Sequence, residues 1–178
     1  MADFFDALTQ KHIDFIQAQQ MFFVATAPRN GRINLSPKGL DCFRILSPNQ
    51  VAYLDFIGSG NETAAHLRED DRITIMFNSF SRNALIMRLY GHGESHAPGS
   101  KKFESLMSLY EQAPGIRQIF TIQIDNLQTS CGYAVPVYDL VEERQTLTKW
   151  SAKKGEQGLK DYVKKHNRIS IDGLPASD

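Results

Sequence analysis

Short runs of apolar and β-branched residues, separated by turn residues, dominate this chain and predict a sheet. Residues 118–124 (Gln-Ile-Phe-Thr-Ile-Gln-Ile) alternate with period two, which is typical of a strand buried on one face. Other runs of similar length are rich in valine, isoleucine, threonine and aromatic residues, which fit a pleated sheet. The predicted strands are residues 22–27, 32–36, 51–56, 72–77, 84–90 and 118–124.

The connections between these runs favour antiparallel pairing. Asn30 and Gly31 separate the first two runs, and an Asn-Gly pair tolerates the positive φ angles of a tight hairpin. Many short strands with few intervening helices favour an antiparallel barrel or sandwich over a doubly wound parallel sheet. A barrel also removes exposed strand edges. We therefore expect a mainly β fold, a β-barrel with flanking helices and six or more largely antiparallel strands.

Helical spacing of apolar residues predicts the flanking elements. Residues 3–20 form the first predicted helix, which Asp3 can cap, provided that His12 counts as semi-apolar. The other predicted helices are residues 62–69, 101–111, 146–154 and 158–166, the last two belonging to a C-terminal helical tail of residues 146–178. Because no repeat or linker interrupts the chain, we expect residues 1–178 to form one domain.

The amino-acid composition argues against two classes of binding partner, nucleic acid and membranes. Lysine plus arginine number 20 and aspartate plus glutamate number 20, so the chain lacks the positive excess that nucleic acid or an anionic membrane surface attracts. No apolar run approaches the roughly 20 residues that span a bilayer. The acidic N-terminus has no secretory signal, which predicts a cytoplasmic location. Cys42 and Cys131 fit no zinc or disulfide spacing, so we expect both to be thiols.

A glycine-rich turn offers the first candidate site. Residues 58–63 (Gly-Ser-Gly-Asn-Glu-Thr) follow a buried strand and open a helix, so Ser59, Asn61 and Thr63 lie where helix amides attract a phosphate. The same residues also fit a capping box, in which Ser59 and Glu62 satisfy each other's backbone donors. Glu62 would repel a phosphate unless its side chain points away. The turn alone leaves both interpretations open.

Two cationic residues accompany this turn. Asn34, Ser36 and Lys38 are spaced by two, so on an extended strand they share a face, and Lys38 could bring a positive charge to the turn. Alternatively, residues 36–39 form an ordinary polar turn. Arg88 interrupts an apolar run, which requires either a bound anion or a position on the solvent face of the sheet.

A metal site is the weaker hypothesis. His92, Glu94 and His96 alternate, and on a continuous strand they would resemble a facial site of two histidines and one carboxylate. Gly91 and Gly93 argue against regular extension there. We therefore interpret these residues as polar strand-end residues and expect no metal.

Four segments together resemble the pyridoxamine 5'-phosphate oxidase-related family, whose members have an FMN-binding split barrel. They are residues 33–39, 52–55, 58–67 and 85–91, and residues 131–136 and 170–175 look like the tail of one subgroup. The resemblance implies a homodimer with two FMN molecules at the subunit interface. It also implies which residues hold the FMN phosphate: Ser36, Lys38, Ser59, Asn61, Thr63 and Arg88.

The departures from the family pattern limit the reaction. The oxidases carry an arginine-lysine pair where this chain has Glu62 and Thr63, and their C-terminal tryptophan and Arg-Leu-x-Pro motif are replaced by Ile-Asp-Gly-Leu-Pro at residues 171–175. We therefore expect an FMN-dependent oxidoreductase that acts on an unidentified small molecule or electron donor, with no catalytic side chain assigned. The alternative is a non-catalytic flavin- or haem-binding module, in which His92 or His96 would bind haem iron.

Overall fold

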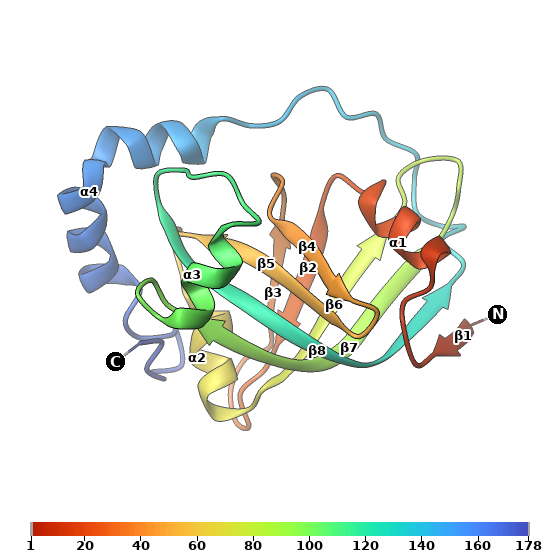
Figure 1. Ribbon diagram of the computed structural model, residues 1–178, viewed down its shortest axis with the longest axis horizontal. Coiled ribbons are helices and arrows are strands. Elements are labelled where there is room, and N and C mark those ends of the chain that lie inside the picture. Colours follow the sequence, from red (N-terminus) through yellow and green to blue (C-terminus); the bar gives the residue numbers. More distant parts are fainter. Residues whose placement is uncertain (1, 178) are drawn as a thin grey trace.

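The computed structural model describes residues 2–177 and has an eight-stranded antiparallel sheet with four flanking helices (Figure 1). The order of the strands is β3-β2-β6-β7-β8-β5-β4, and β1 also pairs with β8. The strands are β1 (Ala2–Phe5), β2 (Phe22–Thr26), β3 (Asn34–Lys38), β4 (Phe43–Ser47), β5 (Gln50–Phe56), β6 (Arg72–Asn78), β7 (Ile86–His96) and β8 (Ile116–Ser130). The helices are α1 (Gln10–Gln17), α2 (Glu62–Glu69), α3 (Lys101–Met107) and α4 (Thr146–His166).

The sheet curls until its two end strands, β3 and β4, are joined by only residues 39–42. These strands do not pair with each other, and side chains close the gap instead. The Phe43 ring on β4 lies 5.0 Å from the ring of Phe22 on β2 and 5.0 Å from the ring of Phe77 on β6, both edge-on. Edge-to-face pairs contribute about 0.5–1.5 kcal/mol beyond burial. The predicted mainly β split barrel with flanking helices is confirmed.

Two bulges re-aim side chains of β8. Asp55 pairs with Gln118 and Phe56 with Ile116, so Arg117 is an extra residue in β8. Tyr90 pairs with Asn126 and Gly91 with Ile124, so Asp125 is a second one. A bulge bends its strand and changes the direction of the extra side chain. The two bulges therefore determine where the charged side chains of Arg117 and Asp125 lie.

The N-terminus differs from the predicted helix over residues 3–20. Residues 2–5 form β1, which pairs with the far end of β8 from Ala2 opposite Ser130 to Phe5 opposite Leu127. The strand β8 extends beyond the end of its partner β5. The strand β1 pairs with that extension, so the backbone N–H and C=O groups at this edge of β8 have hydrogen-bond partners. The helix α1 begins only at Gln10, after Thr9, whose N–H donates to His12 Nδ1 over 3.1 Å.

Two strand predictions also need correction. The strand β4 was not predicted, because Phe43–Ser47 lacks the alternation that marks a half-buried strand. The strand β7 continues through Gly91 and Gly93 to His96, although glycine usually weakens a strand. Gly91 is required there, since a Cβ would lie 2.0 Å from the backbone oxygen of Gln123.

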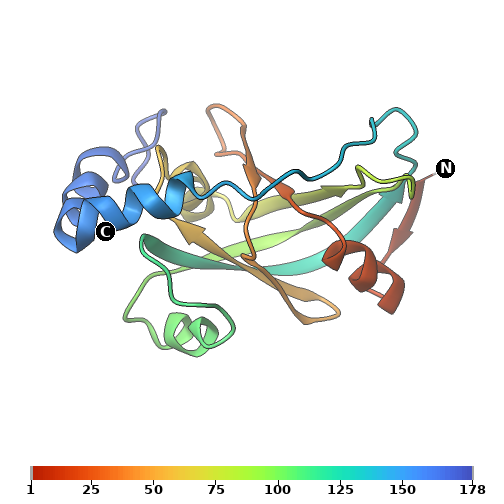
Figure 2. The ribbon, with the colours of Figure 1, turned by 90° about the horizontal axis from the view of Figure 1, so that it is seen from above.

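The C-terminal part crosses the molecule. After β8, residues 131–145 run without regular structure to α4, at the end of the sheet opposite α1 (Figures 1 and 2). Gly155 breaks α4 with φ 65°, so the two predicted helices are its two halves. Residues 167–177 are not helical, in contrast to the helical tail predicted to residue 178. Within residues 2–177 no helix is both long and apolar enough to cross a membrane.

Candidate functional site

The glycine-rich turn connects β5 to α2, and the helix that it opens has no side-chain cap. Asn61 is the N-cap residue, and its side chain makes no capping hydrogen bond. The carboxylate of Glu62 instead accepts a hydrogen bond from the backbone N–H of Ile171 in the C-terminal tail, at 3.2 Å. The alternative interpretation of the turn, a capping box of Ser59 and Glu62, is therefore wrong. Uncapped first-turn amides and the positive end of the helix dipole favour an anion.

Side chains of β8 fix the turn from behind. Arg117 Nη1 donates to Gly60 O over 2.7 Å, and Gln118 Nε2 donates to Asn61 Oδ1 over 2.8 Å. Asn61 is 8% exposed, whereas Ser59 is exposed. Arg117 and Gln118 of β8 thus hold the turn in place. The hydroxyl of Ser59 remains accessible to solvent.

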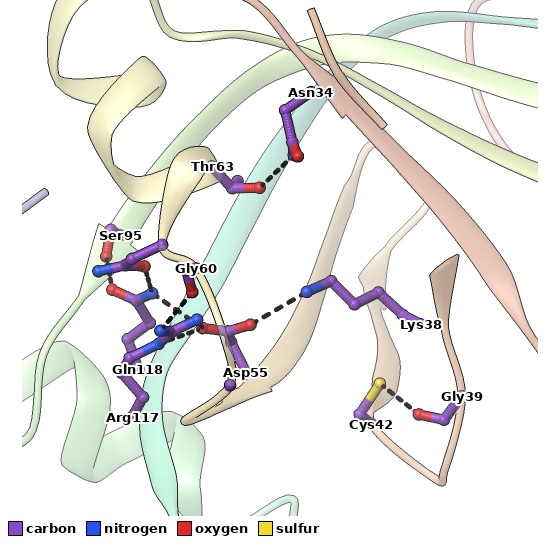
Figure 3. Close-up of polar contacts among 12 residues, drawn as sticks. Asn34, Lys38, Gly39, Cys42, Asp55, Gly60, Thr63, Ser95, Arg117 and Gln118 are labelled. Carbon is purple, nitrogen blue, oxygen red and sulfur yellow. Dashed lines mark hydrogen bonds and ion pairs between the residues drawn. The ribbon is translucent and has the colours of Figure 1, made fainter. Parts of the chain in front are cut away.

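A cluster of three charges lies beside the turn (Figure 3). Asp55 Oδ1 accepts from Lys38 Nζ at 3.2 Å, and Asp55 Oδ2 lies 2.9 Å from Arg117 Nε and 2.8 Å from Arg117 Nη2. Burial alone would raise the pKa of Asp55, but the charges of Arg117 and Lys38 outweigh burial and lower it below its usual value. The carboxylate stays ionised, and two cations against one anion leave one positive charge.

A row of polar side chains leads from this cluster to α2. Asn34, Ser36 and Lys38 alternate along β3 as predicted, and their partners on β2 are buried residues of the inner face. Asn34 Nδ2 donates to Thr63 Oγ1 over 3.4 Å. Among the described residues, the buried Ser36 Oγ has no hydrogen-bond partner. The hydroxyl of Tyr53 on β5 is also buried, and it lies close to the Thr63 side chain. A buried hydroxyl without a partner is costly, so Ser36 Oγ is available to a ligand or to water.

Arg88 lies on the other face of the sheet. Lys38 on β3 lies opposite Phe22 on β2, whose side chain is buried in the core. Arg88 on β7 lies opposite Met76 on β6, and Met76 lies opposite Phe23, the residue that follows Phe22 on β2. Neighbouring residues of a strand point to opposite faces, so Lys38 and Arg88 are separated by the sheet. Arg88 Nη1 donates to Ser130 Oγ over 3.3 Å. Of the six predicted residues, the structure places Ser36, Lys38, Ser59, Asn61 and Thr63 at β3 and the turn, and separates Arg88 from them.

Three residues of this site were not predicted. Asp55 carried a signal, because a carboxylate inside the buried run of residues 51–56 needs a partner. Arg117 and Gln118 carried none. In a regular strand they would point to opposite faces, and only the bulge in β8 brings both to Asp55.

The two histidines weighed for metal binding have other partners, and of the predicted set only Glu94 and His96 lie close together, with 3.9 Å between Oε2 and Nε2 among the described residues. His92 Nδ1 lies 2.8 Å from Asp71 Oδ1 and its Nε2 lies 3.1 Å from Asp125 Oδ2, while His96 Nε2 lies 2.8 Å from Thr121 Oγ1. Among residues 2–177, no three His, Cys, Asp or Glu side chains are grouped so as to hold a metal ion.

The thiol beside the charge cluster is inert. Cys42 Sγ donates to Gly39 O over 3.3 Å, and burial raises the pKa of this thiol to about 12 (Figure 3). A thiol with such a pKa stays protonated near neutrality and is a poor nucleophile. Cys42 therefore contributes packing rather than chemistry.

Comparison with known folds agrees with this architecture. A putative pyridoxamine 5'-phosphate oxidase from Lactobacillus delbrueckii superposes with a TM-score of 0.56 at 13% identity, covering 69% of this chain and 94% of that chain. HupZ from Group A Streptococcus gives 0.56 at 21% identity, covering 67% and 91%. HutZ, the haem storage protein from Vibrio cholerae, gives 0.51 at 15% identity, covering 71% and 97%. At these identities the three structures show the fold alone.

Sequence comparison is more specific. The family model described as Pyridoxamine 5'-phosphate oxidase matches residues 8–131. The pyridoxamine 5'-phosphate oxidase family protein ustO from Aspergillus flavus is 37% identical over 196 aligned positions, which cover 98% of this chain and 78% of that protein. The match includes β3, the turn and α2, where the candidate site lies. On these grounds the chain belongs to the pyridoxamine 5'-phosphate oxidase family.

Proposed function

We propose that this protein binds FMN, with the phosphate at the N-terminus of α2, and that it is an FMN-dependent oxidoreductase acting on a small molecule. The observation that carries this proposal is the uncapped start of α2 beside a buried cluster with an excess positive charge. Membership of the family supports a flavin as the ligand. No one of these features would suffice, because helix N-termini often bind only water.

The residues present fit a phosphate group. Thr63 and Asn34 bring polar atoms to the start of α2, and Ser36 brings a buried hydroxyl that has no partner in the part of the chain that the structure describes. Glu62, which would repel a phosphate, is held by the tail. Lys38 and Arg117 supply the positive charge that the oxidases obtain from an arginine-lysine pair in the turn. A charge-assisted hydrogen bond contributes about 1.5–3 kcal/mol, so a few such contacts would retain the cofactor.

The protein's part in the chemistry is placement and electrostatics. Bound FMN supplies hydride or electron transfer, which no side chain of the cluster can perform alone. Burial raises the pKa of Tyr53 well above its usual value, and the negative charge of Asp55 raises it further, so its hydroxyl remains a donor at neutral pH. Lys38 lies 5.9 Å from the centre of the Tyr53 ring and adds a positive charge to the same region. We assign no catalytic acid or base.

We also propose that two copies associate through the outer face of the sheet. Leu35 on this face of β3 is 63% exposed, and Ile33, which directly precedes β3, is 77% exposed; exposed apolar surface of this kind is typical of an interface. Arg88 lies on the same face, so in a dimer it would contact the interface rather than the inner cluster. Light scattering of the purified protein tests this proposal, since a monomeric mass over the micromolar range would contradict it.

Haem binding is the second candidate, because HutZ shares the fold. The histidines argue against it, since His92 lies between two carboxylates and His96 is 6% exposed and bonded to Thr121. An absorption spectrum separates the two candidates. We expect FMN-reconstituted protein to show flavin bands that a reductant bleaches and an acceptor restores. A Soret band without flavin binding would favour haem, and protein that binds neither would contradict both.

A further inference from the structure

The C-terminal tail, defined here as residues 167–177, lies directly against the glycine-rich turn. Asn167 is fully buried, and its Nδ2 donates to Gly58 O over 3.0 Å. Asn61 Nδ2 in turn donates to the backbone oxygen of Asn167 over 3.4 Å. Further along, Asp172 Oδ2 accepts from the backbone N–H of Arg32 over 2.7 Å, and the two side chains form an ion pair. The tail thus bridges the turn and the hairpin that precedes β3.

A further contact of the tail determines where the negative charge of Glu62 lies. Glu62 is the first residue of α2, and a carboxylate in that position is stabilised by the uncapped amides of the same helix. Both carboxylate oxygens of Glu62 instead accept a hydrogen bond from the backbone N–H of Ile171, each at an N···O distance of 3.2 Å. Its Oε2 also lies 3.9 Å from Nε2 of the buried His66. The carboxylate therefore lies between the tail and the turn, with Oε1 3.7 Å from the point where a Cβ on Gly60 would lie, and among residues 2–177 it accepts no hydrogen bond from the first-turn amides.

We propose that the tail keeps the anion site open, with Ile171 as the positioning residue. Its backbone N–H holds the Glu62 carboxylate away from the amides that the FMN phosphate needs. Without this bond, Glu62 becomes an internal competitor for the same amides and places a negative charge beside the phosphate. The proposal rests on the proposed FMN site and adds a control on its affinity.

The position of Ile171 allows its N–H to be removed almost alone. Gly173 N donates to Ser170 O over 3.0 Å, which makes residues 170–173 a β-turn with Ile171 in its second position. Proline is favoured at that position of a type I or II turn and has no N–H. The Ile171 side chain is 67% exposed, so its loss changes little packing. Ile171→Pro therefore removes the donor, and Ile171→Ala is the matched control that keeps it.

The experiment is FMN titration by fluorescence quenching for the two variants, each with and without Glu62→Gln. We expect Ile171→Ala to bind like the original protein and Ile171→Pro to bind about fivefold to tenfold more weakly, the size of a partly buried charge effect at a helix end. Glu62→Gln should restore the affinity of Ile171→Pro to within about twofold of Ile171→Ala that carries the same Glu62→Gln change, because glutamine carries no charge. Equal affinity of Ile171→Pro and Ile171→Ala, or no recovery with Glu62→Gln, would overturn the proposal. Thermal unfolding identifies a folding defect, which would lower affinity with or without Glu62→Gln and so also count against it.

A second readout separates this inference from the proposed function. If the original protein binds no FMN, the proposed function fails, and the same four variants are compared with inorganic phosphate. Hydrogen exchange of residues 59–65 then reports anion binding at the amides. Phosphate should protect these amides in Ile171→Ala, protect them less in Ile171→Pro, and protect them again once Glu62→Gln is added. The same protection in all variants, or none in any, would overturn the role of the tail.

Discussion

Arg117 and Asp55 form an ion pair at 2.8 Å between neighbouring strands, and the same guanidinium donates to Gly60 O. The carboxylate is 3% exposed and the Arg117 side chain 11% exposed, so solvent screens this pair weakly. The pair exists only because Arg117 is the extra residue of a bulge. The bulge therefore lets Arg117 connect the buried carboxylate of Asp55 to the backbone of the glycine-rich turn.

Arg117→Met should destabilise the fold and loosen the turn. The substitution leaves Asp55 with Lys38 and Gln118 as partners and removes the donor to Gly60 O. Breaking a buried pair from one side costs about 3–5 kcal/mol, and we expect the lower end because Lys38 remains. Urea unfolding measures the loss. A change below about 1 kcal/mol would show that the pair contributes no more than a surface salt bridge.

Ser36→Ala should act in opposite directions on stability and on binding. Ser36 Oγ is buried without a partner within residues 2–177, so its removal should leave the cofactor-free protein unchanged or more stable by up to about 1 kcal/mol. If this hydroxyl contacts FMN, the same variant should bind FMN several-fold more weakly. Thermal unfolding without ligand and FMN titration give the two values. Unchanged FMN affinity would remove Ser36 from the site.

Lys38→Met and Arg88→Met test which face of the sheet binds FMN. Lys38 faces the inner cluster and Arg88 the outer face, so we expect Lys38→Met to weaken FMN binding about tenfold, one lost charge-assisted contact. Arg88→Met, which removes the same charge from the other face, should change the affinity by less than about threefold. Fluorescence titration distinguishes them. The reverse ranking would place the cofactor on the outer face.

His92 should make stability depend on pH. Its hydrogen bond to Asp71 raises the pKa of His92, and the charges of Asp71 and Asp125 raise it further. The folded state therefore holds the proton more tightly. The stabilisation is complete below the ordinary histidine pKa of about 6.5 and is lost as the pH rises through the folded value. His92→Gln should thus reduce the unfolding free energy more at pH 5.5 than at pH 8.5.

The size of that difference is limited by solvent. The His92 side chain is 49% exposed, so we expect less than about 1 kcal/mol, declining with added salt. Asp125→Asn is the control, because it leaves the histidine and removes one of its two partners. It should reduce the pH dependence without abolishing it. A pH profile identical for the original protein and His92→Gln would contradict this account.

The sequence carried enough information for the strands and for most of the turn. Period-two runs and turn residues predicted the sheet, and the spacing of Asn34, Ser36 and Lys38 predicted one shared face, which the structure confirms. The glycine turn was placed correctly at the start of α2. These features are local, so short segments of sequence encode them.

The features that were missed depend on distant partners. The strand β1 forms only because β8 offers a free edge, and Arg117 joins Asp55 only because of a bulge. Glu62 is bound by a residue 109 positions later in the chain. The sheet also separates Arg88 from Lys38, which depends on the register of three strands rather than on either residue. No local pattern contains such relationships.

The affinity of FMN relative to riboflavin tests the central claim most directly, because the two ligands share the flavin ring and differ in the phosphate. If the start of α2 and its positive cluster hold that phosphate, FMN should bind about a hundredfold more tightly, the equivalent of two charge-assisted hydrogen bonds at about 1.5 kcal/mol each. The ratio should shrink as salt is added. Equal affinities for FMN and riboflavin, or binding of neither, would contradict a phosphate site at this turn.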